Sequence, residues 1–207
     1  YNASRQLNSS VTVLGGYSRR FFNNYVEFQN IIMKAEMKSS ISKVNISEGY
    51  NYKRNSTHME SITNDELSHI IDSLLYILNL YQSKIDIKIN AVDGDDITYI
   101  YVDLLINRIP VKIHFSRVED LINQFNFINS DGDVYSLNSN LNGAISSIIS
   151  NTYKETKMNT SKQSSVSVFK EIINFVGKKY YLHEDAKSLT KFTNTISILE
   201  EIKSKIQ

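Results

Sequence analysis

Two Asp-Gly-Asp triplets are the residues of this sequence whose type and spacing first suggest chemistry. One is centred on Gly94 and the other on Gly132, each inside an otherwise apolar run. Carboxylates this close together could bind a divalent cation, but an EF-hand loop needs oxygen ligands at its first position and a bidentate Glu at its twelfth. Alignment on the two glycines places Ile89 and Phe127 at the first position. Because Asp-Gly is also a preferred pair in tight turns, we predict two hairpin turns instead.

The other catalytic patterns fail on spacing. None of the four histidines has a second histidine at metal-ligand spacing on its own predicted element. Asp103 and Lys112 stand on adjacent predicted strands, as in metal-dependent nucleases, but Pro110 occupies the position of the second acidic ligand. The sequence has no Gly-x-Ser-x-Gly elbow, no phosphate-binding glycine loop and no cysteine. We therefore predict no catalytic residues, no metal and no cofactor.

Composition bounds the class of protein. With 41% hydrophobic and 22% charged residues, the 207-residue chain has the composition of a globular protein. Its formal net charge of +1 calls for neither nucleic acid nor an anionic membrane surface as a partner. No run of ~18 apolar residues predicts a membrane span. The lack of cysteine fits an exported domain or an AT-rich genome, which leaves the compartment open, with a periplasmic or extracellular location favoured.

Periodicity predicts the elements that would position these side chains. Apolar residues at helical spacing indicate a helix over about 18–38 and another after Thr63, where Thr63 and Glu66 form a capping box. The period then changes to two, which predicts an antiparallel meander of three strands over about 85–115. Between the first two helices lies a polar stretch that we interpret as a linker, with a short strand near 43–46.

The second half of the sequence predicts more helix than strand. Ser116 and Glu119 form another capping box, which predicts a short helix to about residue 125, and weaker patterns predict helices over 141–152 and 167–176. The final helix presents an apolar face that a partner protein or a second copy of the chain could bind. The residues of this predicted interaction face are Leu189, Phe192, Ile196 and Leu199.

The predicted fold class is α+β. We expect an antiparallel sheet of three to four strands packed with helices and flanked by an N-terminal helix and a C-terminal amphipathic helix. The predicted organisation is an N-terminal helical segment at 1–45, a linker at 46–62 and an α+β domain with C-terminal helices at 63–207.

One stretch resembles a known family. A capped helix, a strand and then Asp93, Leu104 and Arg108 resemble the peptidoglycan-binding domain of the OmpA/MotB type over about 63–108. The resemblance implies that Asp93 and Arg108, fifteen positions apart, would bind the amine and carboxylate of diaminopimelate in the cell wall.

The function predicted from these observations is a non-enzymatic protein-interaction or assembly domain. It would belong to an extracytoplasmic machine, a secreted effector or a viral accessory protein, and its partner would be another protein or a second copy of the chain. Two alternatives stay open at this point. One is a peptidoglycan-binding domain that uses Asp93 and Arg108, and the other is a metal-dependent hydrolase or nuclease whose carboxylates come from distant positions.

Overall fold

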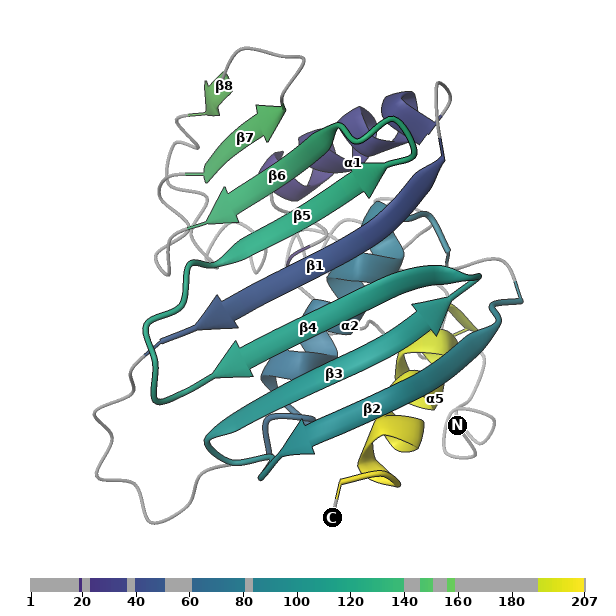
Figure 1. Cartoon of the computed structure of the whole chain (residues 1–207), viewed down its shortest axis with the longest axis vertical. Helices are drawn as coiled ribbons and strands as arrows, with labels where there is room; N and C mark the ends of the chain where they lie inside the picture. The colour runs from purple at the N-terminus through teal and green to yellow at the C-terminus, as the bar shows by residue number, and fades with distance from the viewer. Residues whose placement is uncertain are drawn as a thin grey trace, which may run out of the picture.

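The computed structural model describes residues 19, 23–36, 40–50, 61–80, 84–139, 146–150, 156–158 and 190–206. Its helices are α1 (Asn23–Glu36), α2 (Glu66–Ile77) and α5 (Thr190–Lys203). Its strands are β1 (Ile41–Gly49), β2 (Ile87–Gly94), β3 (Tyr99–Ile106), β4 (Ile109–Ser116), β5 (Gln124–Asn129), β6 (Val134–Ser139), β7 (Ser146–Ser150) and β8 (Thr156–Met158). The strands form one eight-stranded sheet in the order β2-β3-β4-β1-β5-β6-β7-β8 (Figure 1).

The sheet is mixed because two neighbouring inner strands, β4 and β1, run in the same direction. β1 and β4 pair in parallel, with Ile46 opposite Ile113, whereas all other neighbouring strands pair antiparallel. The crossover between β1 and β4 contains α2, and a loop then leads from β4 past the end of β1 to β5 on its other side. The carboxyl ends of β1 and β4 therefore lie side by side at the same end of the strands, next to the β2–β3 hairpin.

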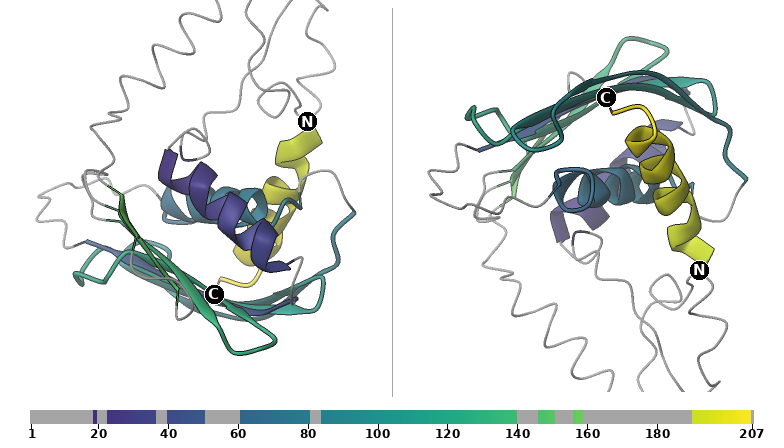
Figure 2. Two further views of the ribbon diagram at one scale, coloured as in Figure 1. Left: turned by 90° about the horizontal axis from the view of Figure 1, so that it is seen from above. Right: turned by 90° about the horizontal axis from the view of Figure 1, so that it is seen from below.

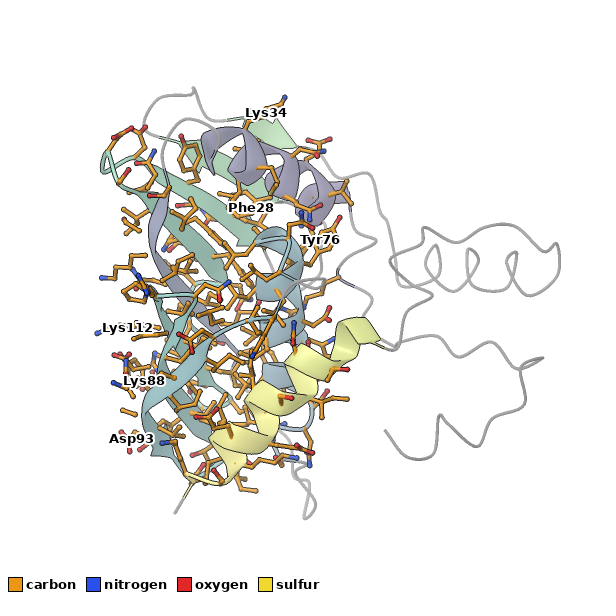
Figure 3. All side chains as sticks on the ribbon, turned by 90° about the vertical axis from the view of Figure 1, so that its right-hand side faces the viewer. Phe28, Lys34, Tyr76, Lys88, Asp93 and Lys112 are labelled. Atoms are coloured by element: carbon orange, nitrogen blue, oxygen red, sulfur yellow. The ribbon has the colours of Figure 1, made fainter. Side chains whose placement is uncertain are left out.

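The described helices cover one face of the sheet, so the core lies in a single layer between helices and strands. Figure 2 shows α1, α2 and α5 on the same side. The sheet side chains that point to this face are buried. They meet the apolar stripe of α2, which consists of Leu67, Ile70, Ile71, Leu74 and Leu75. On the other face Lys88, Asp93 and Lys112 are exposed (Figure 3). Burial of a Leu or Ile side chain stabilises a fold by about 1.5–3 kcal/mol, so this stripe accounts for much of the attachment of α2.

The prediction of an antiparallel sheet of three to four strands is wrong. The meander β2-β3-β4 is present as predicted, but it forms only one side of an eight-stranded sheet. The strand predicted near 43–46 is present but longer than expected: β1 spans 41–49 and lies inside the sheet, between β4 and β5. A β-bulge between Ile41 and Lys43 shifts its register against β5, and this shift breaks the period of two that identifies a strand in sequence.

Two predicted helices are also wrong. The Ser116 hydroxyl accepts hydrogen bonds from the amides of Val118 and Glu119, as a helix cap would, yet β5 begins at Gln124 and no helix forms between them. The helix expected over 141–152 overlaps β7, which pairs with β6. Local capping signals and short apolar runs did not determine these segments. Strand pairing did, with the distant β1 for the first segment and with the neighbouring β6 for the second. The helix expected over 167–176 lies outside the described residues.

The two Asp-Gly-Asp triplets lie at hairpin turns, as predicted. The first connects β2 with β3 and the second connects β5 with β6. Gly94 has a φ of 125° and Gly132 a φ of 86°, a region that favours glycine. A Cβ atom on Gly94 would also stand 2.3 Å from the carbonyl oxygen of Tyr99. Within the described residues, no helix has the length and apolar character that crossing a membrane requires.

Candidate functional site

The candidate site lies where the carboxyl ends of β1 and β4 meet. Open sheets with parallel strands bind ligands at such an edge. Backbone hydrogen bonds gather the neighbouring segments there: the Tyr50 amide donates to the Ser116 carbonyl at 3.0 Å, and the Arg117 amide donates to the Thr98 carbonyl at 2.7 Å. The Ile62 amide donates to the carbonyl of Asp96 at 2.8 Å, which brings the segment before α2 to the same edge.

A buried ion pair links the first turn of α2 to the end of β4. Arg117 donates from Nε to Glu66 Oε1 at 3.0 Å and from Nη2 to Glu66 Oε2 at 2.5 Å. The hydroxyl of Tyr50 donates to Glu66 Oε1 at 2.8 Å. Burial acts to lower the pKa of Arg117, but the hydrogen bonds and charge of Glu66 outweigh it, so the pKa is raised. Arg117 therefore stays charged, and its hydrogen bonds to Glu66 hold the first turn of α2 against the sheet.

A second ion pair stands at the end of β1. Arg19, which precedes α1, donates from Nη1 to Glu48 Oε1 at 2.5 Å and from Nη2 to Glu48 Oε2 at 2.8 Å. The Glu48 side chain is only 6% exposed. Tyr25 lies beside this pair, and burial, only partly offset by the charge of Arg19, raises the pKa of Tyr25 to about 12. Its phenol is therefore neutral over the physiological pH range.

Charges from both ion pairs act on the pKa of His69. It is half-buried on α2, four residues after the exposed Asp65 and hence on the same helical face. Burial and then the charge of Arg19 lower the pKa of His69, against the opposing charges of Asp65, Glu48 and Glu66. A lowered pKa keeps the imidazole neutral at pH 7, the form that accepts a proton.

These groups form a candidate site for proton transfer. A histidine with a shifted pKa among buried charges is typical of functional sites. The site residues are Arg19, Glu48, Asp65, Glu66, His69 and Arg117. Across the described parts of the chain, no group of three or more His, Asp or Glu side chains is arranged to hold a metal ion.

The sequence analysis missed this site because its members are far apart along the chain. The one local signal was the spacing of Asp65 and His69 on a predicted helix. The capping-box interpretation concealed the role of Glu66, and that interpretation is wrong. Thr63 donates its hydroxyl to Asp96, Glu66 binds Arg117, and the helix begins at Asp65 without a side-chain capping hydrogen bond.

Asp93 and Arg108 lie at opposite ends of the β-meander. Asp93 is on β2 opposite Tyr101, on the face away from the helices (Figure 3). Arg108 is in the turn between β3 and β4 with a φ of 69°. From Tyr101 to Ile106, the last residue of β3 before that turn, the strand extends roughly 17 Å. The structure does not bring the two residues together, and neither belongs to the candidate site.

The predicted interaction face of the final helix coincides only in part with the face that α5 buries. Leu199 is 8% exposed and belongs to the core, whereas Ile196 is 44% exposed. α5 packs against α2 and β2 through Ile198 and Ile202, both fully buried. Leu189 and the side chain of Phe192 lie outside what the structure describes.

No protein-family model matches the sequence, and no curated protein matches it. Solved structures do match the fold. An oxidoreductase from Thermotoga maritima is similar with a TM-score of 0.70 at 11% identity, over 99% of this chain and 63% of that one. A dehydrogenase from Clostridium difficile is similar with a TM-score of 0.64 at 16% identity, over 92% and 61%. UDP-N-acetylglucosamine 3-dehydrogenase from Acidithiobacillus ferrooxidans is similar with a TM-score of 0.64 at 9% identity, over 95% and 62%.

These similarities correct the function predicted from the sequence. The named structures are of oxidoreductases and dehydrogenases, which contradicts the prediction of a non-enzymatic interaction or assembly domain and of a secreted interaction protein. The peptidoglycan-binding and hydrolase alternatives are contradicted with it. The chain spans about three fifths of the length of the structures that it matches. The chain has the fold of a large part of these oxidoreductases.

Proposed function

We propose that this chain is the substrate-binding part of an oxidoreductase that acts on a hydroxyl or carbonyl group of a sugar-like substrate. His69 would exchange a proton with that group. The observation that carries the proposal is that His69 is half-buried on α2, where the charges of Arg19, Glu48 and Glu66 from the two buried ion pairs act on its pKa. The shared fold supports an oxidoreductase. The substrate class is supported by two similar structures, a UDP-N-acetylglucosamine 3-dehydrogenase and a 3-ketoreductase in complex with TDP-benzene and NADP.

The chemistry requires a residue that handles a proton at oxygen. Oxidation of a secondary alcohol to a ketone removes a proton from the hydroxyl oxygen and a hydride from the carbon. A neutral imidazole accepts the hydroxyl proton, and the imidazolium returns it to the carbonyl oxygen in the reverse direction. Asp65, on the same helical face as His69, would stabilise the imidazolium that forms. The ion pairs of Glu48 and Glu66 would keep the surroundings of His69 rigid during this transfer.

A nicotinamide dinucleotide does not fit the described residues of this chain. Dinucleotide-binding folds have a mostly parallel sheet with helices on both faces and a glycine-rich turn after the first strand. Here one strand pair is parallel and the described helices lie on one face (Figure 2). The sequence also has no Gly-x-Gly-x-x-Gly motif. More than a third of each similar structure has no counterpart in this chain, and we expect the dinucleotide to be bound by a region of that kind.

The proposal is tested by turnover and by binding. We expect the protein that carries this chain, supplied with NAD or NADP, to oxidise or reduce a sugar in a panel of UDP- and TDP-sugars. His69→Asn should lower kcat about 10²- to 10³-fold, the usual contribution of a general base. The matched control is His114→Asn, because His114 lies on the other face of the sheet beside Tyr101.

Binding to the chain alone separates its role from that of the dinucleotide. Saturation-transfer NMR should detect UDP-N-acetylglucosamine or a TDP-sugar on the isolated 207-residue chain and no NADP. Full activity of the His69→Asn variant would refute the role of His69. Tight binding of NADP to the chain alone would refute the proposal that this chain binds the substrate and another region binds the dinucleotide.

A further inference from the structure

The β2–β3 hairpin holds the segment that leads into α2 through one residue, Asp96. Its Oδ1 accepts hydrogen bonds from the Thr63 amide at 2.7 Å and from the Thr63 hydroxyl at 2.5 Å. Its Oδ2 accepts from the Ser61 hydroxyl at 2.5 Å, and its backbone carbonyl accepts from the Ile62 amide at 2.8 Å. Thr63 and Ile62 are fully buried, so these contacts are shielded from competing water. The carboxylate of Asp96 thus fixes Ser61 and Thr63, and its backbone carbonyl fixes Ile62.

The same hairpin is held from the other side by Arg117. Arg117 donates from Nη1 to the Ile97 carbonyl at 3.3 Å and from its amide to the Thr98 carbonyl at 2.7 Å. The same guanidinium binds Glu66 in the first turn of α2. The hairpin loop 95–98 therefore contacts both the segment before α2 and the residue that holds its first turn. Since α2 has no side-chain capping bond of its own, these contacts set the direction in which the helix begins.

The hairpin loop is itself built to hold Asp96 in place. Asp96 has a φ of 59°, a left-handed conformation that Asp and Asn tolerate better than other non-glycine residues. Asp95 accepts hydrogen bonds at Oδ1 from the Ile97 amide at 2.8 Å and the Thr98 amide at 2.6 Å, which fixes the turn around Asp96. The carboxylate of Asp96 is therefore oriented before it meets residues 61–63.

We propose that Asp96 is a positioning residue for His69: by fixing residues 61–63 it sets the first turns of α2 and hence the position of His69 on that helix. The relevance to catalysis rests on the proposed function, whereas the contacts do not. Asp65 and His69 follow the clamped segment within two turns of helix, so a small rotation of its start moves both. Asp96 contacts the segment just before α2, and it would act on His69 through the backbone of that helix.

The test compares Asp96→Asn with Asp131→Asn. Asparagine keeps the shape and the left-handed conformation but replaces one acceptor oxygen with an NH2 group and removes the charge. We expect hydrogen exchange at the Thr63 amide, which donates to the carboxylate, to accelerate at least about tenfold. We also expect the NMR titration midpoint of His69, assigned with His69→Asn, to move by about half a unit or more toward 6.5. Asp131 is exposed in the turn of the other hairpin, and its variant should change neither quantity.

Two further variants keep the test decisive if Asp96→Asn does not fold. Ser61→Ala and Thr63→Val each remove one hydroxyl donor while the Thr63 amide still binds Asp96, and each should produce part of both effects. Faster exchange with an unchanged His69 midpoint would overturn the proposal, because Asp96 would then be purely structural. An unchanged exchange rate would overturn it as well. A shifted midpoint together with a fully active His69→Asn variant would leave the positioning intact and refute the proposed function.

Discussion

Glu66 and Arg117, 51 residues apart in the sequence, form a bidentate ion pair that is buried between α2 and the end of β4. The Nη2 atom of Arg117 lies 2.5 Å from the Oε2 atom of Glu66. The pair joins the helix that carries His69 to the parallel centre of the sheet. Its position explains why the first turn of α2 can lie at the carboxyl ends of two strands without a cap of its own. The stability and pH behaviour of the protein follow in part from this connection.

Removal of one partner of this pair should destabilise the fold strongly. Arg117→Ala leaves the Glu66 carboxylate buried without its counter-ion, and we expect a loss of about 3–5 kcal/mol in the free energy of unfolding, measured in urea. The control is Lys112→Ala, since Lys112 and Asp103 pair at 3.7 Å with side chains 46% and 26% exposed. An exposed pair contributes at most about 1 kcal/mol. Equal losses for the two variants would show that the buried pair does not stabilise the fold.

The pKa of His69 should make stability depend on pH below neutrality. Because burial lowers this pKa in the folded protein, the unfolded chain binds a proton at higher pH than the folded one does. The folded state therefore loses stability as pH falls through about 6.5, the ordinary value for histidine. Urea unfolding between pH 5 and 7.5 should show this slope, and His69→Asn should reduce it. A titration midpoint of His69 above 6.5 by NMR would contradict the prediction.

Arg19 provides a matched test of the electrostatics at His69. Its charge lowers the pKa of His69, and the charge of Glu48 raises it. Arg19→Gln removes the first effect and leaves Glu48 without its counter-ion, so both consequences should raise the midpoint of His69. Lys34→Gln serves as the control, because Lys34 is exposed at the other end of α1. An unchanged midpoint in Arg19→Gln would mean that the first ion pair lies outside the site.

Gly49 should tolerate a side chain poorly because of the space around it and not because of its φ, which is not positive. A Cβ atom there would stand 2.8 Å from the carbonyl oxygen of Ser116 and 2.9 Å from that of Glu119, where the β4–β5 loop passes the end of β1. Gly49→Ala should cost about 1–3 kcal/mol, typical of overpacking, and should shift the NMR signals of Tyr50. Gly132→Ala meets no atom within 4 Å and is strained only by its φ of 86°. A larger cost at Gly132 would contradict this ranking.

Asp95 should titrate at unusually low pH. Burial acts to raise its pKa, but hydrogen bonds from Thr98, Ile97 and Tyr99 outweigh that effect and lower it to about 2. These bonds stabilise the hairpin above pH 3.8 and are lost as pH falls toward 2, because only the carboxylate accepts them fully. The amide shift of Thr98 should therefore change with a midpoint near 2, and Asp95→Asn should abolish the transition. A midpoint near 3.8 would show that these hydrogen bonds do not form in solution.

Several elements followed from local pattern. The apolar stripe of α2, the β2-β3-β4 meander and the turns at Gly94 and Gly132 were predicted because each depends on residues within about ten positions of one another. Prediction failed where the local sequence was compatible with both a helix and a strand. The Ser116 hydroxyl accepts hydrogen bonds from two amides, as it would at the start of a helix. The chain beyond it instead forms β5 and pairs with β1, because this pairing buries Phe125 and Phe127.

The sequence by itself determined the period of each strong element and the place of its tight turns, because side-chain alternation and turn chemistry act between neighbours in the chain. Only the tertiary structure decided that β1 lies beside β4, that Arg117 pairs with Glu66, and that the charges of Arg19, Glu48 and Glu66 act on His69. Those residues span about a hundred positions, and each taken alone is an ordinary charged side chain. Their chemistry arises from shared burial, since charges removed from water act strongly on one another only after strand pairing has brought them together.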